Sequence, residues 1–149
     1  MTIRRSATLM FLLCMISSAA AAQGPTRKYI DGRSAADTAA TPFSGAVLVG
    51  DTLYLSGHLG ASANAKPDTA EAEAKAVLDR VQATLEKAGM TMDDLVSVQI
   101  FCADVANYAA FNSVYRTYFK KEFPARAFLG SGTLLFGARF EVMGIAVKR

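Results

Sequence analysis

One apolar stripe constrains the fold of this chain more than any other feature. Its members recur every three or four residues, as on one face of an α-helix, and they are Ala74, Val77, Leu78, Val81 and Leu85. Pro67-Asp68 predicts the start of this helix, with Asp68 as N-cap and Glu71 at the capping-box position, and Gly89 predicts its end. A helix with a single apolar face needs a sheet to pack against.

Short apolar segments bounded by glycine, proline or aspartate are candidates for the strands of that sheet. Residues 43–49 and 52–56 flank Gly50-Asp51, which is the pattern of a β-hairpin. The remaining predicted strands are residues 27–30, as an edge strand, 95–102, 126–129 and 139–147.

A second helix is predicted over residues 106–119, with Asp104 as its cap. Its helically spaced aromatic residues are typical of core packing, and they are Tyr108, Phe111, Tyr115 and Phe119. The order of strands and helices predicts an α+β fold, a mixed β-sheet with two helices packed on one face. The opposite face still carries apolar residues, so we expect copies of the chain to cover it.

The first 22 residues have the composition of a secretory signal peptide. Arg4 and Arg5 precede an apolar run over residues 7–16, and a tract of alanines ends at Ala22. Cleavage there leaves residues 23–149 as one domain, which we expect to be exported to the periplasm. A membrane anchor is the alternative, but the run is shorter than the roughly 20 residues that a spanning helix needs.

Removal of this leader also removes most of the net positive charge. The chain has 16 Lys and Arg against 13 Asp and Glu, and two of the basic residues are Arg4 and Arg5, so 14 basic residues remain against 13 acidic ones. A balance so close to neutral gives little support to nucleic-acid binding, and we expect no nucleic-acid partner.

Few residues are suited to metal or cofactor chemistry. His58 is the only histidine, and Cys102 is the only cysteine outside the leader, so the sequence predicts no metal cluster and no internal disulfide. The apolar neighbours of Cys102 favour a small buried side chain over a nucleophile. No glycine-rich phosphate-binding motif is present in the sequence, and we expect no organic cofactor.

Two charged residues near the C-terminus are candidates for a small-molecule site. Arg126 follows Pro124-Ala125, where a planar guanidinium could hold a carboxylate, and Glu141 interrupts an apolar strand, where a carboxylate is costly to bury. A structural ion pair is the alternative for Arg126. The alternative for Glu141 is a pair with Arg139, which shares its face of the strand.

Four collinear segments resemble the RidA/YjgF family of enamine/imine deaminases. They are the run 43–57, the helical stretch ending at Ala88-Gly89, the segment 107–115, and Pro124-Ala125-Arg126. The resemblance covers nearly all of the chain after the leader. It implies a homotrimer with a chorismate-mutase-like barrel at its centre and a ligand cleft at each subunit interface.

The resemblance also implies roles for individual residues. Arg126 is expected to hold the carboxylate of a 2-imino or 2-enamino acid, and Glu141 to orient the water that attacks it. Substrate contacts are expected from Phe43, Ser56, Gly57 and Asn112. For Asn112, a hydrogen bond at the helix surface or at an interface is an equal alternative.

Two departures from the family pattern affect the expected cleft. His58 stands where glutamine is usual, either as an extra acid/base or, as we favour, as a passive pocket residue. Phe128 stands where a small residue or cysteine is usual, and it would narrow the cleft. Both are expected to lie in the substrate site, and they affect the choice of substrate more than the carboxylate anchor.

The sequence is compatible with three functions. The leading one is hydrolytic deamination of 2-enamino or 2-imino acids to 2-oxo acids and ammonia. The second is a non-catalytic exported trimer that binds small carboxylates with the same arginine. The third, an endoribonuclease or translation inhibitor, is disfavoured by the weak charge of the chain after the leader and by its export.

Overall fold

The structure is a computed structural model that describes residues 24–32 and 42–149. The predicted leader lies outside the described residues. One sheet in the described part of the chain has six strands in the order β1-β2-β3-β6-β4-β5. Their bounds are β1 Arg27–Ile30, β2 Ala46–Val49, β3 Thr52–Leu59, β4 Leu95–Cys102, β5 Ala125–Gly130 and β6 Phe140–Val147.

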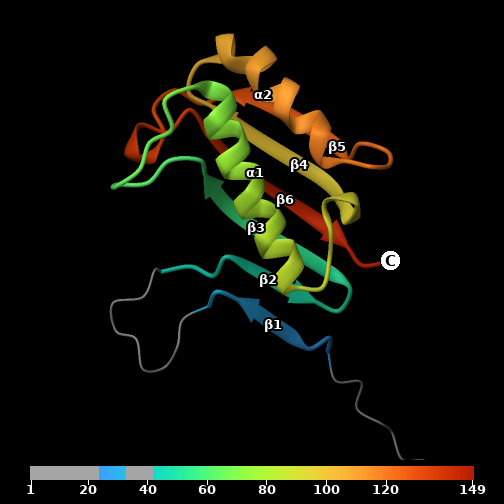
Figure 1. Ribbon diagram of the computed structural model, residues 1–149. Helices are drawn as coiled ribbons and strands as arrows, with labels where there is room; N and C mark the ends of the chain where they lie inside the picture. The colour runs from blue at the N-terminus through green and yellow to red at the C-terminus, as the bar shows by residue number, and fades with distance from the viewer. Residues whose placement is uncertain (1–23, 33–41) are drawn as a thin grey trace, which may run out of the picture.

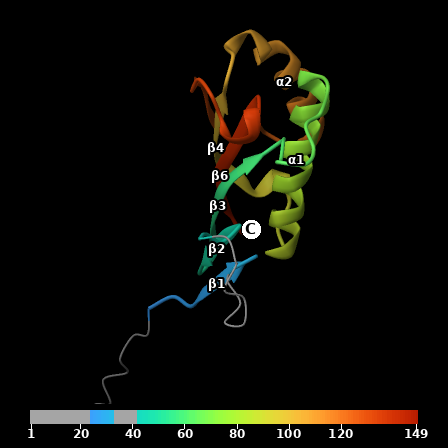
Figure 2. The ribbon, with the colours of Figure 1, turned by 90° about the vertical axis from the view of Figure 1, so that its left-hand side faces the viewer.

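Two α-helices, α1 (Ala70–Lys87) and α2 (Tyr108–Tyr115), lie on the same side of the sheet, as Figures 1 and 2 show. Every strand pairing is antiparallel except that of β4 with β5, which is parallel. The predicted α+β fold, a mixed sheet with two helices on one face, is confirmed. Neither helix of the described residues is long and apolar enough to cross a membrane.

Helix α1 forms as its apolar stripe predicts, although its start differs by one residue. Thr69, not Asp68, is the N-cap, and its Oγ1 accepts a hydrogen bond of 3.1 Å from Ala72 N. The capping box assigned to Glu71 is therefore wrong, because the cap lies one position further along. Gly89 follows the helix at a φ of 74°, the left-handed conformation expected of it.

The second predicted helix is interrupted. In place of one helix over residues 106–119, the chain forms a 3₁₀ turn at Val105–Asn107, then α2, then a second 3₁₀ turn at Arg116–Tyr118. Asp104 caps the first turn through Ala106 N at 2.9 Å, as predicted. The hydroxyls of Ser113 and Thr117 donate to carbonyls three residues back, at Ala110 and Val114, and such bonds compete with regular α-helical pairing.

The core lies between the helices and one face of the sheet. It contains the stripe of α1, the ring of Phe111 and the strand residues that face the helices, among them Leu53, Ile100 and Val142. Tyr115 of the aromatic stripe is also buried, whereas Tyr108 is half exposed. The prediction of core packing therefore holds for Phe111 and Tyr115 and not for Tyr108, the first residue of α2.

The other face of the sheet, here called the open face, carries no helix in the described part of the chain (Figure 2). Cross-strand partners share a face, so the register places Tyr29, Tyr54, Leu129, Met143 and Val147 on it. All five are exposed, up to 58% for Tyr29 and 50% for Tyr54. The open face is thus an apolar surface without a cover in one copy of the chain.

Candidate functional site

Arg126 lies on β5 and points to the helix side of the sheet. Its strand partner is Val98, a buried residue on the same face, and α2 lies above it. Arg126 Nη1 donates a hydrogen bond of 2.7 Å to Asn112 Oδ1, and the Asn112 side chain is buried. Among the described residues no acidic side chain forms an ion pair with Arg126, so the structural pair considered from the sequence is not formed there.

Aromatic rings surround the Arg126 guanidinium on several sides. Its central carbon lies 4.7 Å from the ring centroid of Tyr115, 5.9 Å from that of Tyr108 and 6.0 Å from that of Phe128. Phe128 meets Tyr108 edge-on at 5.0 Å, so it is part of the wall around the arginine. These contacts fix the plane of the guanidinium, and Asn112 uses only one of its five N–H donors.

A cavity of about 330 Å³ opens beside this arginine. Arg126, Asn112 and the rings of Tyr108, Tyr115 and Phe123 line it. Tyr115 Oη is buried and has no hydrogen-bond partner among the described residues, and burial raises the pKa of this phenol to about 12. A protonated, unpaired phenol at an arginine site is a further donor for a bound anion. The aromatic pattern of the sequence predicts only core packing for Tyr115, although its position three residues after Asn112 on one helix face is a usable signal.

Glu141 lies on β6 and belongs to the open face. Its neighbours across the sheet are Leu59 of β3 and Phe101 of β4. The predicted alternative, a pair with Arg139, is wrong, because the Arg139 guanidinium pairs with Glu73 at 2.8 Å. Within the described part of the chain, Glu141 therefore forms no ion pair that would neutralise it.

The carboxylate of Glu141 lies against the backbone of Gly57. A Cβ built on Gly57 would be 2.9 Å from Glu141 Cδ and would collide with Oε1. Gly57 belongs to a β-bulge. Leu55 of β3 pairs with Gly144 of β6 and His58 pairs with Val142, so β3 has one more residue than β6 between these two pairs. The bulge and the lack of a side chain at Gly57 therefore make room for the Glu141 carboxylate.

Ser56 and Phe43 flank the same region. Ser56 Oγ donates to Ser44 O at 2.5 Å, which ties the bulge to the segment before β2, and Phe43 lies exposed in that segment. The structure therefore brings Gly57 and Glu141 together beside Ser56, and Phe43 precedes Ser44, whose carbonyl oxygen Ser56 binds. Their substrate contacts stay predictions.

His58 points to the opposite side of the bulge, under α1. Its Nδ1 lies 2.8 Å from Ser56 O and its Nε2 lies 2.9 Å from Thr84 Oγ1. Burial is the main cause of its lowered pKa, which favours the neutral ring. Both ring nitrogens thus have partners within one copy of the chain, and the substrate contact assigned to this residue stays a prediction.

The two groups of residues do not meet in one protomer. On β4, Val98 pairs with Arg126 of β5 and with Gly144 of β6, whereas Phe101 pairs with Leu129 of β5 and with Glu141 of β6. Arg126 and Glu141 are therefore offset by three residues along the strands, and β4 lies between their two strands. Strand geometry separates their Cα atoms by roughly 14 Å, and the side chains leave opposite faces of the sheet. One copy of the chain therefore carries the Arg126 half and the Glu141 half of the candidate site on different surfaces.

Cysteine and metal-ligating side chains give little support to a second site in the described residues. Cys102 is buried, its Sγ donates to Asp104 O at 3.0 Å, and burial raises its pKa, as expected of an inert thiol. In residues 24–32 and 42–149, no three or more His, Cys, Asp and Glu side chains form a group that could hold a metal ion.

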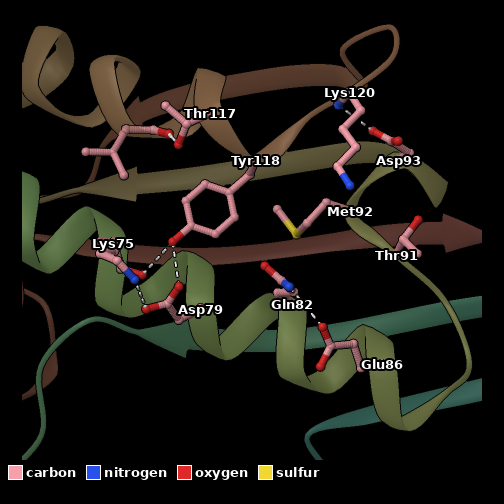
Figure 3. A pocket seen from close by; sticks show the side chains of 11 residues that line it. Lys75, Asp79, Gln82, Glu86, Thr91, Met92, Asp93, Thr117, Tyr118 and Lys120 are labelled. Carbon is pink, nitrogen blue, oxygen red and sulfur yellow. Dashed lines mark hydrogen bonds and ion pairs between the residues drawn. The ribbon is translucent and has the colours of Figure 1, made fainter.

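A larger hollow of about 540 Å³ lies between α1 and the turn after α2 (Figure 3). Tyr118 Oη donates to Asp79 Oδ1 at 2.6 Å there, and Asp79 pairs with Lys75. Several of its polar side chains thus bind one another, and the hollow contains none of the predicted site residues. We assign no site to it.

Comparison with known proteins identifies the family. A family model described as endoribonuclease L-PSP matches residues 33–148. The chain is 39% identical over 116 residues to the 2-iminobutanoate/2-iminopropanoate deaminase of Capra hircus, covering 76% of this chain and 85% of the goat protein. The chain therefore belongs to the endoribonuclease L-PSP family, the family of YjgF and RidA proteins.

Solved structures agree with this assignment. The YjgF gene product of E. coli has a TM-score of 0.72 at 28% identity, covering 82% of this chain and 100% of the E. coli chain. RidA from an Antarctic Psychrobacter bacterium has a TM-score of 0.67 at 28% identity, covering 78% and 94% of the two chains. The resemblance predicted from four sequence segments is confirmed.

Proposed function

We propose that this protein hydrolyses short 2-imino and 2-enamino acids to 2-oxo acids and ammonia. The observation that carries the proposal is the Arg126 guanidinium, held by Asn112 and aromatic rings in a cavity, with no acidic partner among the described residues. The name of the goat relative, an imine deaminase with 85% of its length matched, supports the same chemistry.

The proposed reaction needs a carboxylate anchor and a proton acceptor. Arg126 forms a charge-assisted pair with the substrate carboxylate, and Glu141 orients a water molecule toward the C=N carbon. A 2-enamino acid reacts as its imine tautomer. As the water oxygen bonds to the C=N carbon, the π bond breaks, one water proton passes to Glu141, and Glu141 returns that proton to the nitrogen, which gives a carbinolamine. The carbinolamine then collapses: its hydroxyl proton passes through Glu141 to the nitrogen, the C=O bond forms as the C–N bond breaks, and ammonia and the 2-oxo acid leave.

The active form that we propose is a homotrimer in which the Arg126 half of one copy meets the Glu141 half of another. Two observations support it. The two halves lie on different surfaces of one copy, and the open face exposes a set of apolar residues that Tyr29 and Tyr54 dominate. Association would cover this face and complete the site in one step.

Light scattering tests this assembly. We expect three times the protomer mass for the parent at micromolar concentration, and a smaller species for Tyr54→Glu, because a charge on the open face opposes burial. Ala83→Glu, on the exposed side of α1, is the control and should keep the parental mass. A parent that stays monomeric would contradict both the trimer and the shared site.

We further propose export to the periplasm, motivated by the Arg4-Arg5, apolar and alanine order of the leader. The enzyme would then act on imines that oxidases or dehydrogenases release outside the cytoplasm. Intact-mass measurement on protein from the periplasmic fraction should give a chain that begins at Gln23. Recovery of the full chain in the cytoplasm would contradict the export proposal and leave the reaction untouched.

The runner-up function is a trimer that binds small carboxylates without turnover. Phe128 in the wall around Arg126 favours it, because this ring leaves less room beside the anchor. Nucleic-acid partners, including an endoribonuclease substrate, have less support, since the chain without its leader is almost neutral. Measurement of 2-oxo acid release separates the enzyme from the carboxylate binder.

A further inference from the structure

We propose that Glu73 is a positioning residue for Glu141, a role that rests on the proposed function. Glu73 belongs to the first turn of α1 and is 0% exposed, so its carboxylate is completely buried. Nothing in the proposed reaction uses it directly. Its hydrogen-bond donors in the described part of the chain, however, all come from the two residues that precede Glu141.

The contacts anchor the start of β6. Glu73 Oε1 accepts from the backbone N–H of Arg139 at 2.5 Å and from that of Phe140 at 3.2 Å. Glu73 Oε2 accepts from Arg139 Nη1 at 2.8 Å. Because Glu141 is the next residue of the chain, α1 thereby fixes the backbone from which the proposed catalytic carboxylate projects.

The neighbouring residues are shaped around this carboxylate. A Cβ built on Gly60 would lie 2.5 Å from Glu73 Cγ, so glycine leaves the room that the glutamate needs. Gly60 N also donates to Phe140 O at 3.3 Å, which joins the end of β3 to the same anchor. The Arg139 guanidinium donates in addition to Pro67 O at 2.9 Å and Asp68 O at 3.2 Å.

Stability alone is a weak reason for such an arrangement. A buried ion pair loses much solvation, and apolar side chains of similar volume often stabilise a core as well or better. What a buried, directional carboxylate adds is a fixed position for the groups that it binds. That position matters here, because the Glu141 carboxylate sits against Gly57 with no room for a Cβ.

Glu73→Gln tests the role. The amide keeps the shape and one acceptor oxygen, but its NH2 group faces the Arg139 guanidinium, so the anchor is weakened. We expect kcat for imine hydrolysis to fall about 10- to 100-fold, the cost of displacing a reacting group by up to about 1 Å. The Kd of 2-oxobutanoate, which depends on Arg126, should stay within about twofold. Glu71→Gln, an exposed change in the same turn, is the control and should keep the parental kcat.

A second variant distinguishes loss of positioning from general destabilisation of the fold. In Glu73→Gln alone, the new NH2 group and the Arg139 guanidinium are two donors that face each other. Adding Arg139→Met removes the guanidinium, and the amide oxygen at position 73 can still accept from the backbone N–H groups of residues 139 and 140. We expect this double variant to regain most of the lost kcat, which general destabilisation would not predict.

Parental kcat in a correctly assembled Glu73→Gln variant, or equal losses in kcat and in 2-oxobutanoate affinity, would overturn the positioning role alone. If the parent itself releases no ammonia, the proposed function fails, and the positioning role fails with it.

Discussion

Arg126→Lys should lower kcat/KM for 2-iminobutanoate by about 100-fold, which corresponds to about 2.7 kcal/mol of transition-state binding. Lysine keeps the charge but loses the planar fork, the hydrogen bond to Asn112 and the stacking on Tyr115. The measurement is 2-oxobutanoate release at several imine concentrations, together with the Kd of 2-oxobutanoate. The value of kcat/KM should fall and the Kd of 2-oxobutanoate should rise, because Arg126 binds the carboxylate in the ground state and in the transition state.

Arg149→Lys is the matched control for this change. Arg149 lies at the C-terminus, where it contacts Asp94 at 3.5 Å, and it belongs to neither half of the site. Its replacement should leave kcat/KM unchanged within about twofold. Parental turnover by Arg126→Lys would show that the carboxylate anchor lies elsewhere.

Glu141→Gln should lower kcat by about 1,000-fold, within the range expected when a general base is lost. Glutamine fills the same space against Gly57 but cannot accept the proton of the attacking water. The Kd of 2-oxobutanoate should stay within about threefold, because Arg126 is intact. This separation of rate from binding distinguishes the role of Glu141 from that of Arg126.

An exposed glutamate, Glu122, supplies the control for that variant. Glu122→Gln removes the same charge before β5 and should keep the parental kcat. A Glu141→Gln variant that loses affinity and keeps its kcat would instead make Glu141 a binding residue. That result would favour the carboxylate-binding alternative over the deaminase.

The layers of the fold are predictable from the sequence because its periodic signals are local. The stripe from Ala74 to Leu85 and the Gly50-Asp51 turn each depend on residues close in the chain, and both are present in the structure. The predicted start of α1 is wrong by one position because Asp68 and Thr69 are both good caps, and only the geometry of Ala72 N selects between them.

The site is harder to predict because its determinants are distant in sequence. Glu73 and Arg139 are 66 residues apart, and nothing local indicates that a glutamate on the buried side of α1 would find that partner. The placement of His58 depends on a single extra residue in a bulge, which reverses the face of each residue after it.

The arrangement of Arg126 and Glu141 depends on register. Their types and motifs predict both as site residues, yet sequence alone does not show that β5 and β6 present them on opposite faces. Resemblance to the family implies an interface cleft, and the register supplies a physical reason for one. The proposed trimer would explain both the open face and the separation of the two residues.

Hydrolysis of imines derived from amino acids is the activity that we propose for this protein. The direct measurement generates 2-iminobutanoate in situ with an amino-acid oxidase and follows ammonia and 2-oxobutanoate release with and without the purified protein. We expect release well above the spontaneous rate, proportional to protein concentration and lost in Arg126→Lys. Release at the spontaneous rate by a correctly assembled parent protein would contradict it.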